Sequence, residues 1–76
     1  MNELMKKSIG AAAKRWRIER RMSQNDMAAE LGCSRSMVSQ FERGFSISGD
    51  IFGSLIWNGL PYEYITEEMN KNESDC

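Results

Sequence analysis

The sequence predicts a single all-α domain that is built from five short helices. Apolar residues recur at helical spacing along most of the 76 residues. Residues that suit helix starts and helix ends divide the chain into segments: Ser23, Ser34 and Ser48 at the starts, and Gly32, Gly44 and Gly59 at the ends. A chain of this length buries only roughly 60–65% of its unfolded surface, so its core is small and a partner would stabilise it.

The first helix is expected over about residues 8–20. An apolar stripe that ends in a basic residue defines it: Ile9, Ala13, Trp16 and Arg20. Residues 1–7 are polar and are expected to form a flexible N-terminus. The folded domain is therefore expected to span residues 8–70.

The second helix is expected over about residues 24–31. Ser23 can cap its start, and Asp26 three residues later can complete a capping box. Met22 and Met27 have the spacing of a hydrophobic staple. Gly32 follows directly and suits the left-handed conformation that ends many helices.

The third helix is expected to begin after Ser34 and to end at Gly44. Its inner side carries Met37, Val38 and Phe41 at helical spacing. The opposite side holds only hydrogen-bonding groups and no acid: Arg35, Ser36, Ser39, Gln40 and Arg43. An ordinary solvated helix usually includes Glu or Asp, so this composition favours a surface that meets an anion.

The second and third predicted helices have the features of a helix-turn-helix. Ala28 is small enough to let the two helices cross closely, and Gly32 permits the sharp turn between them. Cys33 lies in the turn and is expected to pack as a small apolar residue. This arrangement leaves the outer face of the third helix free, and such a face can enter a DNA major groove.

The fourth helix is expected over about residues 49–57, with Ser48 as its cap. Its core candidates are Ile51, Phe52, Leu55 and Ile56, and the aromatic residues expected in the core are Trp16, Phe41, Phe52 and Trp57. Pro61 suits the first turn of the fifth helix. That helix directs Tyr62, Ile65 and Met69 toward the core or a partner, and residues 71–76 are expected to be an acidic, disordered tail.

Charge is distributed unevenly along the chain. Residues 1–44 carry nine Lys or Arg against five Asp or Glu, whereas residues 45–76 carry one Lys against six acids. The basic half coincides with the predicted helix-turn-helix, so the molecule can present one face to phosphate although its net charge is −1.

The composition argues against catalysis and metal binding. Histidine is absent, which removes the commonest general base and zinc ligand. Cys33 and Cys76 make neither a disulfide framework nor a metal site. We therefore expect no enzyme, no cofactor, no metal and no small-molecule ligand. No stretch is apolar enough to span a bilayer, so the cytoplasm is the expected location and no membrane partner is expected.

The spacing of these residues resembles the lambda-repressor-like helix-turn-helix family, which includes phage repressors and Cro proteins. The resemblance covers roughly residues 8–66 and rests on Ile9-Gly10, Trp16-Arg17, Ser23-Gln24, Met27-Ala28, Leu31-Gly32, Ser34, Val38, Ser39, Glu42 and Gly44. It implies a compact five-helix bundle with the helix-turn-helix at the second and third helices. One departure is Arg21, which stands where the family often has Gly.

The resemblance also implies roles for individual residues. The residues implied to contact base edges are Arg35, Ser36, Ser39 and Gln40. The residues implied to contact phosphates are Gln24, Ser34, Arg43 and Ser46. Helix N-termini favour anions, which agrees with the position of Gln24. Arg17 and Glu42 match a structural ion pair between the first and third helices. Small members of the family usually pair, and the candidate dimer residues are Tyr62, Ile65 and Met69.

The function expected from the resemblance is sequence-specific, double-stranded DNA-binding transcription regulation. The protein would be a homodimeric repressor or controller, typical of phages, plasmids or restriction–modification systems. It would occupy an operator and block or recruit RNA polymerase. The alternative is an antitoxin-type module that binds another protein. We rank it lower because such modules favour a long hydrophobic tail, and this tail is short and acidic.

Overall fold

The computed structural model describes residues 2–74 of the chain, with side chains described as far as Asn72. Five helices make up the fold: α1 (Glu3–Glu19), α2 (Gln24–Leu31), α3 (Arg35–Glu42), α4 (Gly49–Trp57) and α5 (Tyr62–Ser74). No strand occurs within residues 2–74. The predicted all-α five-helix fold is confirmed.

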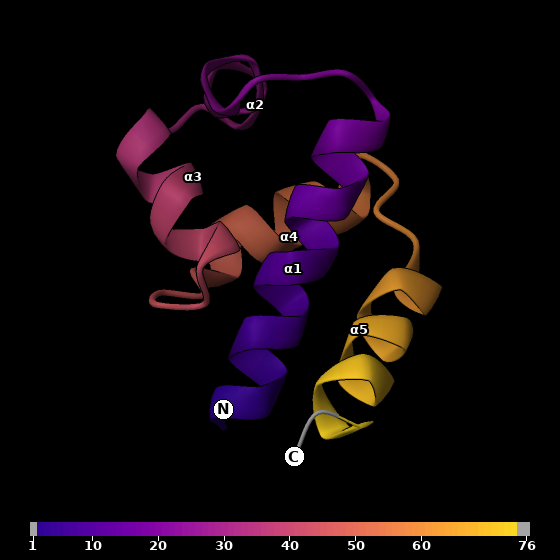
Figure 1. Ribbon diagram of the computed structural model, residues 1–76. Coiled ribbons are helices and arrows are strands. Elements are labelled where there is room, and N and C mark those ends of the chain that lie inside the picture. The colour runs from indigo at the N-terminus through magenta and orange to yellow at the C-terminus, as the bar shows by residue number, and fades with distance from the viewer. Residues whose placement is uncertain (1, 75–76) are drawn as a thin grey trace.

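The long helix α1 is the centre of the arrangement. Figure 1 shows α2 and α3 on one side of α1, α5 on the other side and α4 behind it. The core lies where these helices meet, and its members are Ile9, Ala12, Ala13, Trp16, Met27, Ala28, Val38, Phe41, Ile51, Leu55, Leu60 and Ile65. None of the five helices is both long enough and apolar enough to cross a membrane, as far as the described residues go.

Local signals set the starts of three helices. The hydroxyl groups of Ser23, Ser34 and Ser48 each accept a hydrogen bond from a backbone N–H in the first turn of the following helix. Ser23 and Asp26 form the complete capping box. Each bond satisfies an amide that would otherwise lack a partner, which explains why the predicted starts of α2, α3 and α4 are confirmed.

Helices α1 and α5 extend beyond the bounds expected from the sequence, into the segments 1–7 and 71–76 that were expected to be flexible or disordered. Helix α1 begins at Glu3 because the Asn2 side chain accepts a hydrogen bond from the Met5 N–H and caps the helix. Helix α5 continues to Ser74, and near its end the Asn72 amide donates to Ser8 Oγ on α1. Residues 3–7 and 71–74 are therefore helical, whereas residue 1 and residues 75–76, Cys76 among them, lie outside the described residues.

Arg21 occupies the left-handed region between α1 and α2. Its φ is 58°, and it is the one non-glycine residue with positive φ in the described part of the chain. This is the position where the related family often has Gly. The conformation is uncommon for a residue with a Cβ atom, so the turn carries some backbone strain.

Two of the predicted core residues of α4 face solvent. Ile51 and Leu55 are buried and Phe52 is half-buried, as expected, but Ile56 is exposed and Trp57 is 90% exposed. Leu55 fixes the inward direction of this helix. Trp57 lies two residues, about 200°, further round the helix and therefore points away from the core.

Candidate nucleic-acid interface

Helix α3 is anchored by two buried side chains. Val38 and Phe41 are almost completely excluded from solvent, whereas Met37, which was expected on the same inner side, is 45% exposed. Met37 precedes Val38 by one residue and so lies at the edge of the buried stripe. The core therefore holds α3 by one side only.

The opposite side of α3 is open. The side chains of Arg35, Ser36, Gln40 and Arg43 are exposed and Ser39 is half-buried. The structure thus brings the four predicted base-reading residues and Arg43 onto one surface. No acidic side chain of α3 lies on this surface, because Glu42 is buried on the other side.

Hydrogen bonds along α3 organise this surface. Arg43 Nη2 donates to Ser39 Oγ at 3.2 Å, and Gln40 Nε2 donates to Ser36 Oγ at a longer 3.5 Å. The guanidinium group of Arg43 also lies 5.3 Å from the centre of the Phe45 ring. Phe45 is exposed and was not expected at the site, although an aromatic residue directly after the helix was a visible signal.

A buried ion pair fixes α3 to α1. Arg17 Nε and Nη2 donate to the two Glu42 carboxylate oxygens at 2.6 and 3.2 Å. The side chains are only 11% and 3% exposed. Arg17 Nη1 donates further to the Met22 carbonyl at 2.8 Å, so the same guanidinium group also holds the turn that leads into α2.

Gln24 joins this ion pair. Its Nε2 donates to Glu42 Oε1 at 3.0 Å, which connects the start of α2 to α3. Because Gln24 is the first residue of α2, its backbone N–H lies among the amides that have no partner within the helix. The structure therefore gives Gln24 a positioning contact and leaves the unpaired backbone N–H groups of the α2 terminus beside it.

The first turn of α2 carries its own negative charge. Asp26 accepts a hydrogen bond from the Ser23 backbone N–H at 2.9 Å, and this bond lowers the pKa of the carboxyl group. Ser34 at the start of α3 similarly accepts from the Met37 N–H at 3.1 Å, which leaves its hydroxyl proton available. Ser46 is exposed in the loop after α3.

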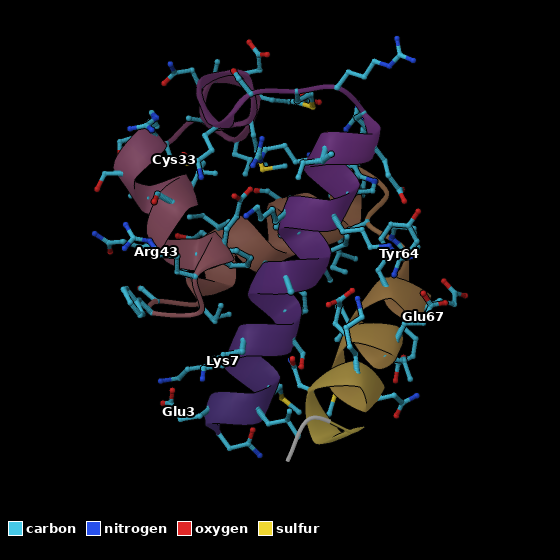
Figure 2. The ribbon with its side chains drawn as sticks, viewed as in Figure 1. Glu3, Lys7, Cys33, Arg43, Tyr64 and Glu67 are labelled. Carbon is cyan, nitrogen blue, oxygen red and sulfur yellow. The ribbon has the colours of Figure 1, made fainter. Side chains whose placement is uncertain are left out.

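Lys7 is a basic residue that the sequence did not assign to the site. A Cβ atom on Gly44 would lie 3.0 Å from the Lys7 Cα, so α1 and the loop after α3 are in close contact there. The Lys7 side chain is exposed, and Figure 2 shows it on the same side of the molecule as Arg43. Lys7 was not assigned to the site from the sequence because residues 1–7 were expected to be flexible.

Cys33 occupies the turn between α2 and α3. It is half-buried against the core, and burial raises the pKa of its thiol. Its backbone N–H donates to the Ala28 carbonyl at 3.0 Å, next to Gly32 with its φ of 71°. The predicted packing role for Cys33 agrees with this position.

A sequence model of the helix-turn-helix family (HTH_3) matches residues 14–55. The matched segment runs from the second half of α1 to α4 and is more than half of the chain. The chain belongs to the Cro/C1-type helix-turn-helix family. No match is found among curated proteins or among solved structures.

Membership in the helix-turn-helix family indicates which surface of the molecule faces DNA. The family consists of DNA-binding transcription regulators of the lambda-repressor type and is not a family of enzymes. In the helix-turn-helix, the second helix of the motif is the one that lies in the major groove. Here that helix is α3, and its open surface is the candidate DNA-binding surface.

Two of the residues predicted at a dimer interface contact the core of this helix-turn-helix protein. Ile65 is buried in the core, and Met69 packs against it, because α5 lies along α1. Burial in the core argues against the prediction that Ile65 forms a dimer surface, and it leaves Met69 only partly open to a partner. Tyr62 is 73% exposed and remains accessible.

Acidic residues gather away from the candidate DNA-binding surface. Figure 2 shows Glu67 and Tyr64 on the side of α5, opposite Arg43. Arg15 on α1 pairs there with Glu67 at 2.7 Å and lies 3.8 Å from the centre of the Tyr64 ring. The charge asymmetry of the sequence thus becomes a basic side around α3 and an acidic side around α5.

Proposed function

We propose that this helix-turn-helix protein is a sequence-specific, repressor-like regulator that places α3 in the major groove of an operator and binds there as a dimer. The observation that carries the proposal is the outer side of α3. It offers exposed hydrogen-bonding side chains and no acid, on a helix whose inner side is fixed by Val38, Phe41 and the Glu42 ion pair.

Arg35 and Gln40 are the proposed principal base readers. Arg35 lies in the first turn of α3 and can present two donors to the O6 and N7 atoms of guanine. The Gln40 amide has the donor and acceptor that match adenine. Its bond to Ser36 is long, at 3.5 Å, so the amide can exchange it for a base edge. Ser36 and Ser39 are the proposed shorter-range contacts.

Phosphate contacts are proposed on both flanks of α3. The N-terminus of α2 at Gln24 and the hydroxyl group of Ser34 lie on one flank, and Arg43 and Ser46 lie on the other. The exposed Lys7 extends the second flank, because its backbone contacts Gly44. Neutralising these phosphates would release counterions and supply much of the affinity.

Selection of bound sequences from a random duplex pool tests this proposal directly. The full chain is expected to enrich a near-palindromic site with half-site centres roughly 34 Å apart. An enriched site without internal symmetry would contradict the dimer, and the absence of any enrichment would contradict sequence-specific binding.

The salt dependence of binding tests the phosphate contacts separately. About four charged contacts per protomer give a log–log slope near −4 for one protomer on a half-site, and about twice that slope for the dimer on the full site. Lys7→Ala is expected to reduce the half-site slope by about one. Lys71→Ala is the matched control, because Lys71 lies on α5 beside Glu68 and its removal should leave the slope unchanged. If the slope is the same for the wild type and both variants, Lys7 does not contact a phosphate.

A further inference from the structure

Met37 is an exposed apolar side chain on the helix that is proposed to lie in the major groove. It is 45% exposed, whereas the neighbouring Val38 is 1% exposed. An isolated exposed apolar residue is common on protein surfaces and by itself indicates no function. Met37 differs in its position, because it is the third residue of α3 and the N-terminal part of a recognition helix is the part that contacts base edges.

Helix geometry places Met37 beside Gln40. Residues three positions apart lie about 60° from one another round a helix, so their side chains are neighbours on its surface. Phe41, four positions after Met37, is buried and lies on the other side of it. Met37 therefore occupies the boundary between the buried stripe of α3 and its open surface, and its exposed part borders the proposed base reader Gln40.

The fold does not use Met37 as an anchor of α3. Val38 and Phe41 belong to the core cluster, and among the described residues Met37 lies outside both that cluster and the partly buried side chains packed against it. The Met37 backbone N–H donates to Ser34 Oγ at 3.1 Å, but this bond does not depend on the methionine side chain. The side chain is therefore available for a contact at the surface.

The chemistry of this side chain fits one group in the major groove. Base pairs present hydrogen-bond donors and acceptors there, and the apolar group among them is the C5-methyl group of thymine. A thioether accepts hydrogen bonds only weakly, so Met37 gains little from the polar base edges. It gains from covering a methyl group, and its three rotatable bonds let it adjust to the position of that group.

We propose that Met37 contacts the C5-methyl group of a thymine in the operator and thereby determines specificity at that base pair. The inference rests on the proposed function and adds an apolar reader to the polar residues on the open surface of α3. Because Met37 lies beside Gln40, the thymine is expected in, or directly next to, the base pair whose adenine Gln40 contacts.

Replacement of each operator thymine by deoxyuridine, one at a time, tests this contact. The operator is the sequence that the random duplex pool yields. Deoxyuridine pairs with adenine and keeps the O4 acceptor, so it removes the methyl group and leaves the adenine contact of Gln40 in place. The wild type is expected to lose affinity about fourfold at one thymine of each half-site, which is the value of burying one group of this size.

Three variants separate a methyl contact from a structural role of Met37. Met37→Ala should bind the thymine and deoxyuridine operators equally, and α3 should form because alanine favours helix. Met37→Leu should keep most of the methyl dependence, since leucine is apolar and similar in volume. Met5→Ala is the matched control and should keep the wild-type dependence: Met5 is 36% exposed on α1 and lies about 200° round that helix from Lys7.

The ratio of the affinities for thymine and deoxyuridine operators decides the result. A structural role would lower both affinities by the same factor, so a ratio that Met37→Ala leaves unchanged would overturn the contact. Wild-type binding that is equal for the two bases at every position would also overturn it, as would an enriched operator without thymine. If the pool yields no enriched sequence at all, the proposed function fails and the contact fails with it.

Discussion

Helix α1 makes an ion pair with α3 through Arg17 and two with α5 through Arg15, and the shortest pair on each side differs in burial. Arg17 and Glu42 are 11% and 3% exposed, whereas Arg15 and Glu67 are 34% and 57% exposed. Exposed pairs contribute little because water and salt screen them. Removal of one partner from a buried pair leaves a charge without compensation and is strongly destabilising.

This difference divides the molecule into two regions. The region around α3 is fixed by a buried pair, by the bond from Gln24 and by close backbone packing, which suits a helix that must hold its side chains in a defined orientation. The region around α5 combines apolar contacts with exposed charges. Its docking should therefore respond more to salt and pH than the orientation of α3 does.

Removal of the buried carboxylate should give the largest loss of stability. Glu42→Ala leaves Arg17 buried without its partner and the Gln24 amide without its acceptor. The expected cost is about 3–5 kcal/mol of unfolding free energy, measured by urea denaturation. The double variant Arg17→Met/Glu42→Leu is the control and should recover much of this loss. A cost as small as that of a surface pair would contradict the distinction between the regions.

Gly10→Ala should have the next largest effect. A Cβ atom at this position would lie 2.4 Å from the Phe41 carbonyl oxygen, so α1 and α3 would have to separate. Overpacking of this kind costs about 1–3 kcal/mol. Gly53→Ala is the matched control within a helix. It meets no atom within 4 Å and should stabilise the chain by about 0.5–1 kcal/mol. Equal effects of the two substitutions would show that α1 and α3 are not closely packed.

Loss of the α2 cap should have a smaller effect. Ser23→Ala removes the hydroxyl group that accepts from the Asp26 N–H and should cost about 1 kcal/mol. Because the pKa of Asp26 is lowered, the stabilisation from its carboxylate is present above the ordinary carboxyl pKa and is lost as the pH falls through the lower folded value. Thermal melts between neutral and strongly acidic pH should show this loss in the wild type, and Asp26→Asn should reduce it.

The exposed network on α5 should give the smallest effect. Arg15→Ala removes the pair with Glu67, the longer pair with Glu68 and the stacking on Tyr64, but Lys71 stays beside Glu68. The resulting shift in melting temperature should therefore be the smallest of the four and should shrink as salt is added. The Tyr64 hydroxyl donates to Glu19, which raises the pKa of Tyr64. Its stabilising contribution is therefore present below the ordinary tyrosine pKa and is lost as the pH rises through the higher folded value. Hydrogen exchange of α5 amides at high salt measures whether this helix loosens before α3 does.

The predictable part of the fold is encoded in neighbouring residues. The serine caps and the glycine turns act over three or four positions, so the bounds of α4 and the starts of α2 and α3 could be predicted from the sequence. The outer face of α3 could be predicted for the same reason, because helical spacing separates it from Val38 and Phe41.

The unpredicted part depends on contacts between distant segments. The early start of α1 had a local signal in the Asn2 cap, but the contact of this helix with the loop at Gly44 has no local sequence signal. The Gln24 bond to Glu42 likewise joins residues 18 positions apart. The exposure of Trp57 was missed because apolar character suggested burial, whereas the positions of Ile51 and Leu55 decide which side of α4 faces the core.

Titration of Arg35→Ala and Arg15→Ala against DNA tests most directly whether the open surface of α3 reads sequence. Both variants lose one arginine, but Arg35 lies on that surface and Arg15 lies on the α5 side. We expect Arg35→Ala to lose discrimination at one operator position, worth roughly 1–3 kcal/mol, and Arg15→Ala to bind operator variants and random duplex like the wild type. Uniform weakening by Arg35→Ala on every duplex would assign Arg35 to phosphate and leave Ser39 and Gln40 as readers. Unchanged binding by Arg35→Ala on every duplex would contradict the assignment of α3 as the recognition helix.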